Sequence, residues 1–337
     1  MSTPAEWIVK QPQGLLVKPA SAYIDPMQPV EHAIITHGHA DHARAGHKHV
    51  YATPETLAIM ATRYGQDHAR FIRPIPYRKT VDIGESTLTF YPAGHILGSA
   101  QAAITHANKT VVFAGDYKRT PDPTCEPFEP VDCDVFVTEA TFGLPVFKHP
   151  DIRHEMKKLL SSLSLFPERC HLVGVYALGK CQRVLLALRD AGYEKPVFLH
   201  GALSKLCDLY IDYGFNFGEL IAVSDVADLR TLAGEIVLAP PSALADRWSR
   251  KLPNVLTCMA SGWMQIRARS KQRRAELPLI ISDHADWPEL LRTLQDVNAP
   301  EVWVTHGRED ALLHQARKMG FKAQALSLVG YEEDDSS

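Results

Sequence analysis

The chain has 337 residues, of which 45% are hydrophobic and 22% are charged, and this length predicts about two globular domains with a substantial core. Its 36 lysines and arginines against 39 aspartates and glutamates give a formal net charge of −3, which excludes a uniformly basic nucleic-acid-binding protein but not a local basic surface. The 16 histidines are the unusual feature of the composition, because imidazole is the commonest metal ligand in proteins.

The six cysteines are scattered and include no C-x-x-C pair, so the sequence predicts reduced thiols in place of a disulfide framework. Residues 1–10 lack the charged-then-apolar order of a secretion signal, and no apolar run approaches the roughly 18 residues of a membrane span. We therefore expect a cytoplasmic protein that has no membrane partner.

Residues 6–113 predict a β-rich core, because short apolar runs alternate with turn residues. The expected strands are 7–9, 14–17, 33–36, 50–52, 86–91, 102–105 and 110–114, and another follows at 134–138. One helix interrupts them, since Thr53-Pro54-Glu55 supplies an N-cap, a proline at the first helical position and an acidic residue in the first turn.

After about residue 145 helices and strands alternate, which is typical of a parallel α/β unit. The expected helices are 153–165, 179–191, 205–213 and 242–252, and the expected strands are 171–175, 196–200, 235–239 and 255–260. From residue 278 the expected elements are strands at 279–282 and 301–305 and helices at 288–296 and 310–319. The acidic residues 332–335 predict a solvated tail.

Five apolar runs each lead into a His or an Asp that is followed by loop residues. They end at His37, His95, Asp116, His284 and His306. Because strand ends in a sheet can converge on one edge, these side chains predict a metal site.

The strongest single motif is His37-x-His39-x-Asp41-His42. From a loop, the first two side chains can reach one metal ion and the last two a second. Imidazole nitrogens and carboxylate oxygens without thiolates favour Zn²⁺, with Mn²⁺ as the alternative.

These residues resemble the signature of the metallo-β-lactamase superfamily, with Asp25 in the place of its first, non-ligand aspartate. The resemblance implies two zinc ions that share Asp116 as a bridging ligand. The other implied ligands are His37, His39 and His95 for one ion, and Asp41, His42 and His306 for the other.

The long stretch between Asp116 and the last ligand resembles the β-CASP nucleases, in which an extra α/β domain is inserted at this point. Glu139, His284 and His306 match motifs A, B and C of that family. Ala177-Leu-Gly179-Lys180-x-Gln182 and Ser261-Gly262-Trp263 resemble recurrent segments of the inserted domain. The resemblance implies an α/β protein in which a metallo-β-lactamase αββα sandwich is interrupted by a β-CASP α/β domain. The implied parts are 1–145 and 278–330 for the sandwich, 146–277 for the insertion and 331–337 for the tail.

Within this family the chain is most similar to the bacterial DNA ligase-associated exonucleases. The resemblance implies a zinc-dependent phosphodiesterase, a DNA exonuclease acting on single strands in DNA repair, associated in function with a DNA ligase and a helicase. His306 at motif C is typical of RNA-cleaving members, whereas the Artemis-like DNA nucleases usually carry Val there, so an RNA-processing ribonuclease is the alternative. A thioester or lactone hydrolase is an alternative from another class, and the intact ligand set disfavours a non-catalytic scaffold.

Three residues would carry the chemistry. A hydroxide held between the two ions, which Asp116 bridges, would attack the phosphate. His284 would protonate the leaving alkoxide, and Glu139 would orient His284 and raise its pKa.

Substrate binding is expected to depend on a basic segment from Arg247 to Arg274, which has eight basic residues and no Asp or Glu. From the segment and the two motifs of the inserted domain, the expected substrate-binding residues are Lys180, Ser261, Gly262, Arg267 and Arg269. Trp263 is predicted to be a core residue, with stacking on a base as the alternative. The ten histidines outside the motifs, including His32 and His49, are expected to be ordinary surface or core residues.

Overall fold

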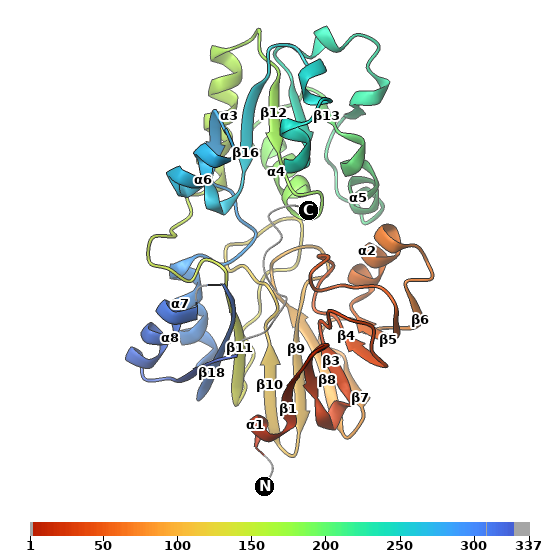
Figure 1. Ribbon diagram of the computed structural model, residues 1–337, viewed down its shortest axis with the longest axis vertical. Helices are drawn as coiled ribbons and strands as arrows, with labels where there is room; N and C mark the ends of the chain where they lie inside the picture. Colours follow the sequence, from red (N-terminus) through yellow and green to blue (C-terminus); the bar gives the residue numbers. More distant parts are fainter. Residues whose placement is uncertain (1–2, 308, 327–337) are drawn as a thin grey trace. The chain divides into compact units, whose positions relative to one another are not determined.

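The computed structural model of the protein describes residues 3–307 and 309–326, with only the backbone of His306 described. They form two compact units (Figure 1). The first contains the described residues of segments 1–148 and 284–333, and the second contains residues 149–283. These boundaries lie a few residues beyond those expected at 145 and 277. No helix in the described parts of the chain combines the length and the apolar character needed to cross a membrane.

Two sheets lie at the centre of the first unit. One has the order β1-β2-β3-β4-β5-β6, with antiparallel pairing up to β3 and parallel pairing from there on. Its strands are Ile8–Gln11, Gly14–Val17, Ala22–Ile24, His32–Ile34, His47–Ala52 and Ala69–Pro74. The other has the order β19-β18-β11-β10-β9-β8-β7. Its strands, from β7 to β11 and then β18 and β19, are Thr80–Ile83, Ser86–Pro92, Ala100–His106, Lys109–Phe113, Val135–Ala140, Glu301–Gly307 and Lys322–Ala325.

Three layers of apolar side chains hold these sheets and their helices together. Ile34, Phe90 and Trp303, from both sheets, belong to one buried cluster between them. Leu57 and Met60 of helix α2 (Pro54–Tyr64) pack on the outer face of the first sheet. Helices α7 (Trp287–Val297) and α8 (Glu309–Lys318) cover the second sheet in the same way. The first unit is therefore an αββα sandwich, and the predicted α/β class is confirmed.

The second unit is built on one parallel sheet, with the order β14-β13-β15-β12-β16-β17. In chain order from β12 its strands are His171–Gly174, Val197–Leu199, Leu220–Ala222, Ile236–Ala239, Leu256–Ala260 and Leu277–Leu279. The helices are α3 (Ile152–Leu165), α4 (Lys180–Asp190), α5 (Gly201–Asp212) and α6 (Arg267–Gln272). Strands β12 and β15 are buried along their whole length, as parallel sheets covered on both faces require.

Two predicted elements are wrong. The helix expected at 242–252 is replaced by two short 3₁₀ turns, Pro241–Ala245 and Ser249–Lys251. The Ser249 hydroxyl donates to the carbonyls of Leu244 and Asp246, and such local bonds compete with helical ones. The strand expected at 279–282 lies instead at Leu277–Leu279 and pairs with β16 at the edge of the second unit's sheet, where Pro278 is tolerated.

Candidate metal centre

The candidate ligands follow strand ends of the first unit. His37, His39, Asp41 and His42 lie in the loop after β4, while His95 follows β8 and Asp116 follows β10. Helix α2 presses on this loop, because a Cβ placed on Gly38 would lie 2.5 Å from Cγ2 of Ile59. A glycine between the two histidines therefore lets the loop approach the helix closely.

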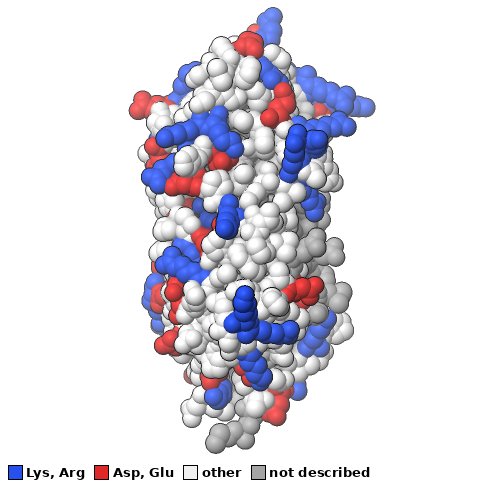
Figure 2. Space-filling view, turned by 90° about the vertical axis from the view of Figure 1, so that its left-hand side faces the viewer, with Lys and Arg blue, Asp and Glu red and all other residues white. Residues whose placement is uncertain are grey.

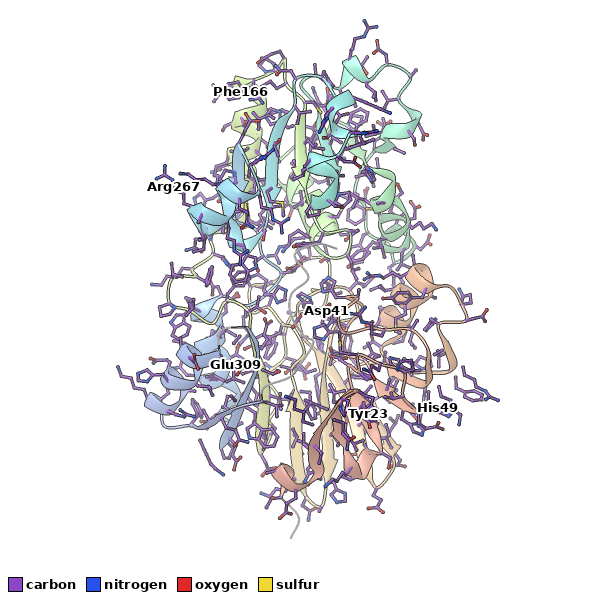
Figure 3. The ribbon with its side chains drawn as sticks, viewed as in Figure 1. Tyr23, Asp41, His49, Phe166, Arg267 and Glu309 are labelled. Carbon is purple, nitrogen blue, oxygen red and sulfur yellow. The ribbon has the colours of Figure 1, made fainter. Side chains whose placement is uncertain are left out.

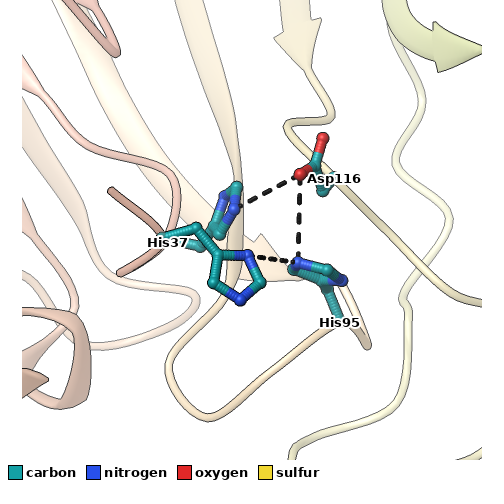
Figure 4. A group of neighbouring side chains, drawn as sticks. His37, His95 and Asp116 are labelled. Atoms are coloured by element: carbon teal, nitrogen blue, oxygen red, sulfur yellow. Dashed lines mark hydrogen bonds and ion pairs between the residues drawn. The ribbon is translucent and has the colours of Figure 1, made fainter. Parts of the chain in front are cut away.

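Four side chains converge closely enough to hold one ion (Figure 4). His37, His39, His95 and Asp116 each offer a ligand atom within 4.8 Å of those of the other three. His95 Nε2 and His39 Nδ1 are 3.0 Å apart, close to the ~3.3 Å expected for two nitrogens on one tetrahedral zinc. The His37 side chain is fully buried, and within the described residues its Nε2 makes no well-aligned hydrogen bond, although the Asp116 carboxylate lies 3.4 Å away. A buried imidazole nitrogen that faces a carboxylate without a good hydrogen bond fits a metal ligand.

Asp116 lies between this cluster and the second predicted pair of ligands. Its Oδ2 is 3.4 Å from Nε2 of both His37 and His42, and 3.9 Å from Nε2 of His95. His42 Nε2 also lies 3.7 Å from the Asp41 carboxylate. This is the position that a carboxylate bridging two ions would occupy.

The electrostatics of the cluster favour bound cations. Burial, together with the neighbouring His42, holds the pKa of His37 well below its usual value, so that its imidazole is neutral. Although burial lowers the pKa of His42, the carboxylates of Asp116, Asp41 and Asp25 outweigh it and raise this pKa to about 10. Burial raises the pKa of Asp116, but the surrounding histidines bring it well below its usual range. The negative field that attracts a proton to His42 would equally attract a metal ion.

The Asp25 carboxylate holds the loop that carries the candidate ligands in place by hydrogen bonds. Its Oδ1 accepts from the Thr36 backbone N–H at 2.7 Å, and its Oδ2 accepts from the Thr36 hydroxyl at 2.6 Å. The same Oδ2 lies 2.8 Å from His42 Nδ1, which leaves Nε2 facing Asp116. Such outer partners set the orientation and basicity of ligating histidines. Thr36 was not anticipated from the sequence, although its place before His37 was visible.

Replacing Asp25 by asparagine is expected to lower the affinity for the ion held by His42 by about 10- to 100-fold. The backbone of Asp25 has φ 41°, a left-handed conformation that Asn tolerates, so the fold should persist. Competition with a chromogenic chelator measures the two affinities. A change confined to thermal stability, with both metal affinities intact, would show that Asp25 acts only as a structural residue.

A second carboxylate–imidazole pair adjoins the cluster. Glu139, in β11, is buried, and its Oε1 accepts from the Tyr117 backbone N–H at 2.8 Å. Its Oε2 lies 3.0 Å from His284 Nδ1. The His284 ring is 4.7 Å from the ring of His95, centroid to centroid.

Lys118 was missed by the sequence analysis. Its buried ammonium donates to the His284 carbonyl at 3.3 Å and to Glu289 at 3.2 Å. Glu289 also completes the capping box of α7 with Asp286. Lys118 therefore fastens the segment carrying His284 to the loop after Asp116. No motif marked it, because its role depends on a contact 166 residues away in the sequence.

His306, the expected seventh ligand, lies in β18, and its side chain is outside the described part of the chain. Its neighbours in the strand are described, and Val304 pairs with Thr138 of β11. The strand that carries His306 therefore lies beside the strand that carries Glu139.

The expected substrate-binding residues all lie in the second unit. Lys180 is 3% exposed, and its ammonium donates to Asp283 at 2.5 Å. The Ser261 hydroxyl accepts from the Trp263 backbone N–H as the N-cap of a turn that includes Gly262. Arg269 is exposed on α6 with its guanidinium 5.5 Å from the centroid of the half-buried Trp263 ring.

Arg267 is also exposed on α6 (Figure 3). On the face that carries α6, Lys and Arg side chains are interspersed with Asp and Glu (Figure 2). The Glu276 carboxylate, just beyond the basic segment, forms an ion pair with Arg169 at 2.8 Å. The run of basic residues in the sequence is thus not an unbroken positive surface on this face.

Two family models match the chain. Residues 4–156 match a beta-lactamase superfamily domain, and residues 278–326 match a Zn-dependent metallo-hydrolase RNA specificity domain. All of the candidate metal ligands, as well as Glu139 and His284, lie within these two matched segments.

Curated relatives carry names from both DNA and RNA metabolism. A protein of Opitutus terrae named "Probable DNA ligase" is 29% identical over 332 residues, covering 95% of this chain and 31% of that protein. Endoribonuclease YSH1 of Saccharomyces cerevisiae is 24% identical over 301 residues, covering 72% of this chain and 38% of that protein. Cleavage and polyadenylation specificity factor subunit 3 of Dictyostelium discoideum is 33% identical over 147 residues, covering 40% of this chain and 19% of that protein. The chain spans about a third of the length of the first two.

Among solved structures, a protein of unknown function from Enterococcus faecalis matches with a TM-score of 0.53 and 12% identity. The match covers 83% of this chain and 76% of that protein. At this identity the likeness concerns the fold.

Proposed function

Because the chain belongs to the metallo-β-lactamase superfamily and to its β-CASP branch, we propose that it is a metal-dependent nuclease that degrades DNA from strand ends, on single strands, in DNA repair. The observation that carries the nuclease proposal is the cluster of His37, His39, His95 and Asp116 beside the Glu139–His284 pair. Two zinc ions, with manganese as the alternative, bound there would polarise the phosphate oxygens and supply an activated water.

The residues of this chain then have distinct tasks. His37, His39 and His95 would hold one ion, Asp41, His42 and His306 the other, and Asp116 would contact both. Glu139 holds His284 by its Nδ1, so that Nε2 can give a proton to the leaving alkoxide. Because Glu139 is itself anchored by the Tyr117 N–H, the pair is oriented before substrate arrives.

The choice of DNA rests on the Opitutus terrae relative. A protein named as a DNA ligase contains a region similar to 95% of this chain, which supports a function beside a ligase in repair, with a helicase as a further associate. The second candidate is an RNA-processing ribonuclease, favoured by His306 and by the endoribonuclease relatives. A thioester or lactone hydrolase is a weaker candidate. We propose a cytoplasmic setting, since none of the six cysteines, all within the described residues, forms a disulfide.

One assay separates these candidates. The zinc- or manganese-loaded protein is incubated with single-stranded DNA, double-stranded DNA and RNA of matched sequence, each labelled at either end. We expect single-stranded DNA to be shortened progressively from one end. Cleavage of RNA alone would replace the DNA proposal by the ribonuclease one, and ester turnover without any strand cleavage would refute both.

A further inference from the structure

Three aromatic rings form a continuous stack on the first sheet, away from the metal centre. His32 of β4, His49 of β5 and Phe71 of β6 are register partners on neighbouring strands. The rings of His32 and His49 are 4.6 Å apart with an interplanar angle of 16°, and those of His49 and Phe71 are 4.8 Å apart at 20°. Figure 3 labels His49 at the outer edge of the unit that also holds Asp41.

The stack ends at Phe71, over whose ring the Arg70 guanidinium lies 5.4 Å from the centroid. β6 is the edge strand of the sheet, and Phe71 is 49% exposed, next to Ile72 at 50%. Behind Phe71, β5 adds the His49 ring and β4 the His32 ring. Among the described residues no strand pairs with the outer side of β6, so no further strand continues the stack beyond Phe71. A half-exposed ring that is supported from behind is a platform on which another flat ring, such as a nucleobase, can stack when the Arg70 side chain turns from the ring to a phosphate.

One guanidinium group lies over the end of this platform, and two more lie over other aromatic rings of the same unit. The guanidinium groups of Arg70, Arg73 and Arg63 lie 5.4, 6.0 and 5.7 Å from the ring centroids of Phe71, Tyr51 and Tyr64. Within the described residues none of the three arginines forms an ion pair with a carboxylate, so their charges are available to phosphates. The combination of a base platform with unneutralised guanidinium groups matches a single-stranded nucleic acid.

One of these arginines connects the platform to the metal loop. Arg63, near the end of α2, donates from Nη1 to the carbonyl of Gly38 at 3.0 Å, between His37 and His39. Its neighbour Tyr64 is 38% exposed and precedes β6 by a short loop. Basic and aromatic side chains thus continue from the edge strand to the loop of the metal centre.

A metal ion is the competing occupant, because Glu31, His32 and His49 bring ligand atoms within 4.8 Å of one another. The nitrogen lone pairs of an imidazole lie in the ring plane, however. In two rings stacked at 16° these lone pairs run side by side and do not converge on one point. The Glu31 carboxylate is also held by the Lys48 ammonium at 2.5 Å. Both contacts favour stacking over chelation.

We propose that the His32–His49–Phe71 stack and the neighbouring Arg63, Arg70 and Arg73 form an accessory binding site for single-stranded nucleic acid, which holds the strand at a distance from the metal centre. The identity of the occupant rests on the proposed nuclease function. An accessory site of this kind lowers KM for long strands and leaves kcat and the cleavage of very short substrates unchanged.

The test measures binding by fluorescence anisotropy, with the metal-loaded full chain and a phosphorothioate oligothymidylate of about 20 nucleotides that resists cleavage. Phe71→Ala and Phe71→Leu both remove the aromatic ring and are expected to raise the Kd about 10-fold. Phe71→Leu keeps an apolar side chain, so it separates the loss of stacking from the loss of apolar surface. Phe71→Trp keeps a ring and should keep the affinity. Arg70→Gln should raise the Kd less and reduce its dependence on salt. Leu165→Ala, which changes a 72% exposed apolar residue of the other unit, is the matched control.

Equal affinities of Phe71→Ala and the unaltered chain, with both folded by circular dichroism, would overturn the proposal. The proposal would also be overturned if His32→Ala and His49→Ala each lost one zinc equivalent, because the stack would then be a metal site. The control is His314→Ala, which changes an exposed histidine and should lose no zinc. If the proposed nuclease function were wrong, the unaltered chain would cleave no strand, and this result differs from a loss of binding in the Phe71 variants. If cleavage occurs, the KM for long strands should rise about 10-fold in Phe71→Ala at constant kcat.

Discussion

Replacing Asp116 by alanine is expected to abolish metal binding at one or both positions and to lower kcat/KM for strand cleavage by at least about 1,000-fold. The reason is geometric. One oxygen of this carboxylate lies 3.4 Å from both His37 and His42, so its loss removes the contact common to the two candidate ligand sets. His37 and His42 would then face one another without the carboxylate between them, while Asp25 and Asp41 would remain beside His42. Metal content by mass spectrometry and cleavage of end-labelled DNA are the two measurements.

Asp122 offers a matched control, since it is another buried aspartate in the same unit but caps a local turn by accepting from Thr124 at 2.9 Å. Asp122→Asn should keep both metals and most of the activity. If Asp116→Ala kept two metal equivalents and bound them as tightly as the unaltered chain, the bridging assignment would be wrong.

His284→Ala is expected to keep both metal ions and to lower kcat by about 100- to 10,000-fold, the range for losing one general acid. His284 Nδ1 is bound to Glu139, and the predicted ligand set does not include it. Its ring nevertheless lies 4.7 Å from the His95 ring, so metal content has to be measured in the same preparation. Loss of a metal equivalent would make His284 a ligand and contradict the division of roles.

The proton-donor role has its own signature. In a nitrophenyl phosphodiester the nitrophenolate group leaves without being protonated. The His284→Ala variant should therefore cleave this substrate at nearly the rate of the unaltered chain. Glu139→Gln removes the charge and leaves one acceptor oxygen for two partners, the Tyr117 N–H and the His284 ring. It should therefore also slow the cleavage of DNA more than that of the nitrophenyl substrate, by a smaller factor than His284→Ala. Equal losses of rate with nitrophenyl and DNA substrates would indicate that His284 positions the substrate instead.

Motif spacing and the family resemblance together predicted the candidate metal centre, because its candidate ligands lie at strand ends and in one loop. His37-x-His39-x-Asp41-His42 needs no tertiary information to suggest two ions, and the structure brings His37, His39, His95 and Asp116 together as expected. Periodicity likewise predicted most strands of both units. It missed β3, β6, β7, β14 and β19. β6, for example, is exposed at nearly every position and has no alternation of apolar and polar residues.

The partners of buried charged side chains such as Lys118 and Lys180 are set by contacts between distant parts of the sequence, which no local pattern reveals. Lys118 reaches His284 only because β10 and the start of α7 meet in the folded unit. Lys180 was expected to bind substrate, and in the fold its buried ammonium forms an ion pair with Asp283. In both cases the sequence specified the charge, and the fold decided its partner.

The 16 histidines show the same division. From the sequence, the short spacing of His37, His39 and His42 predicted metal ligands, and the resemblance to family motifs added His95, His284 and His306 to the same candidate site. His32 and His49 had no motif and were expected to be ordinary residues. Only the parallel register of β4, β5 and β6 stacks them behind the exposed Phe71. Pairing between strands is a long-range property of the chain, so the tertiary structure alone could turn them into a candidate surface for a substrate strand.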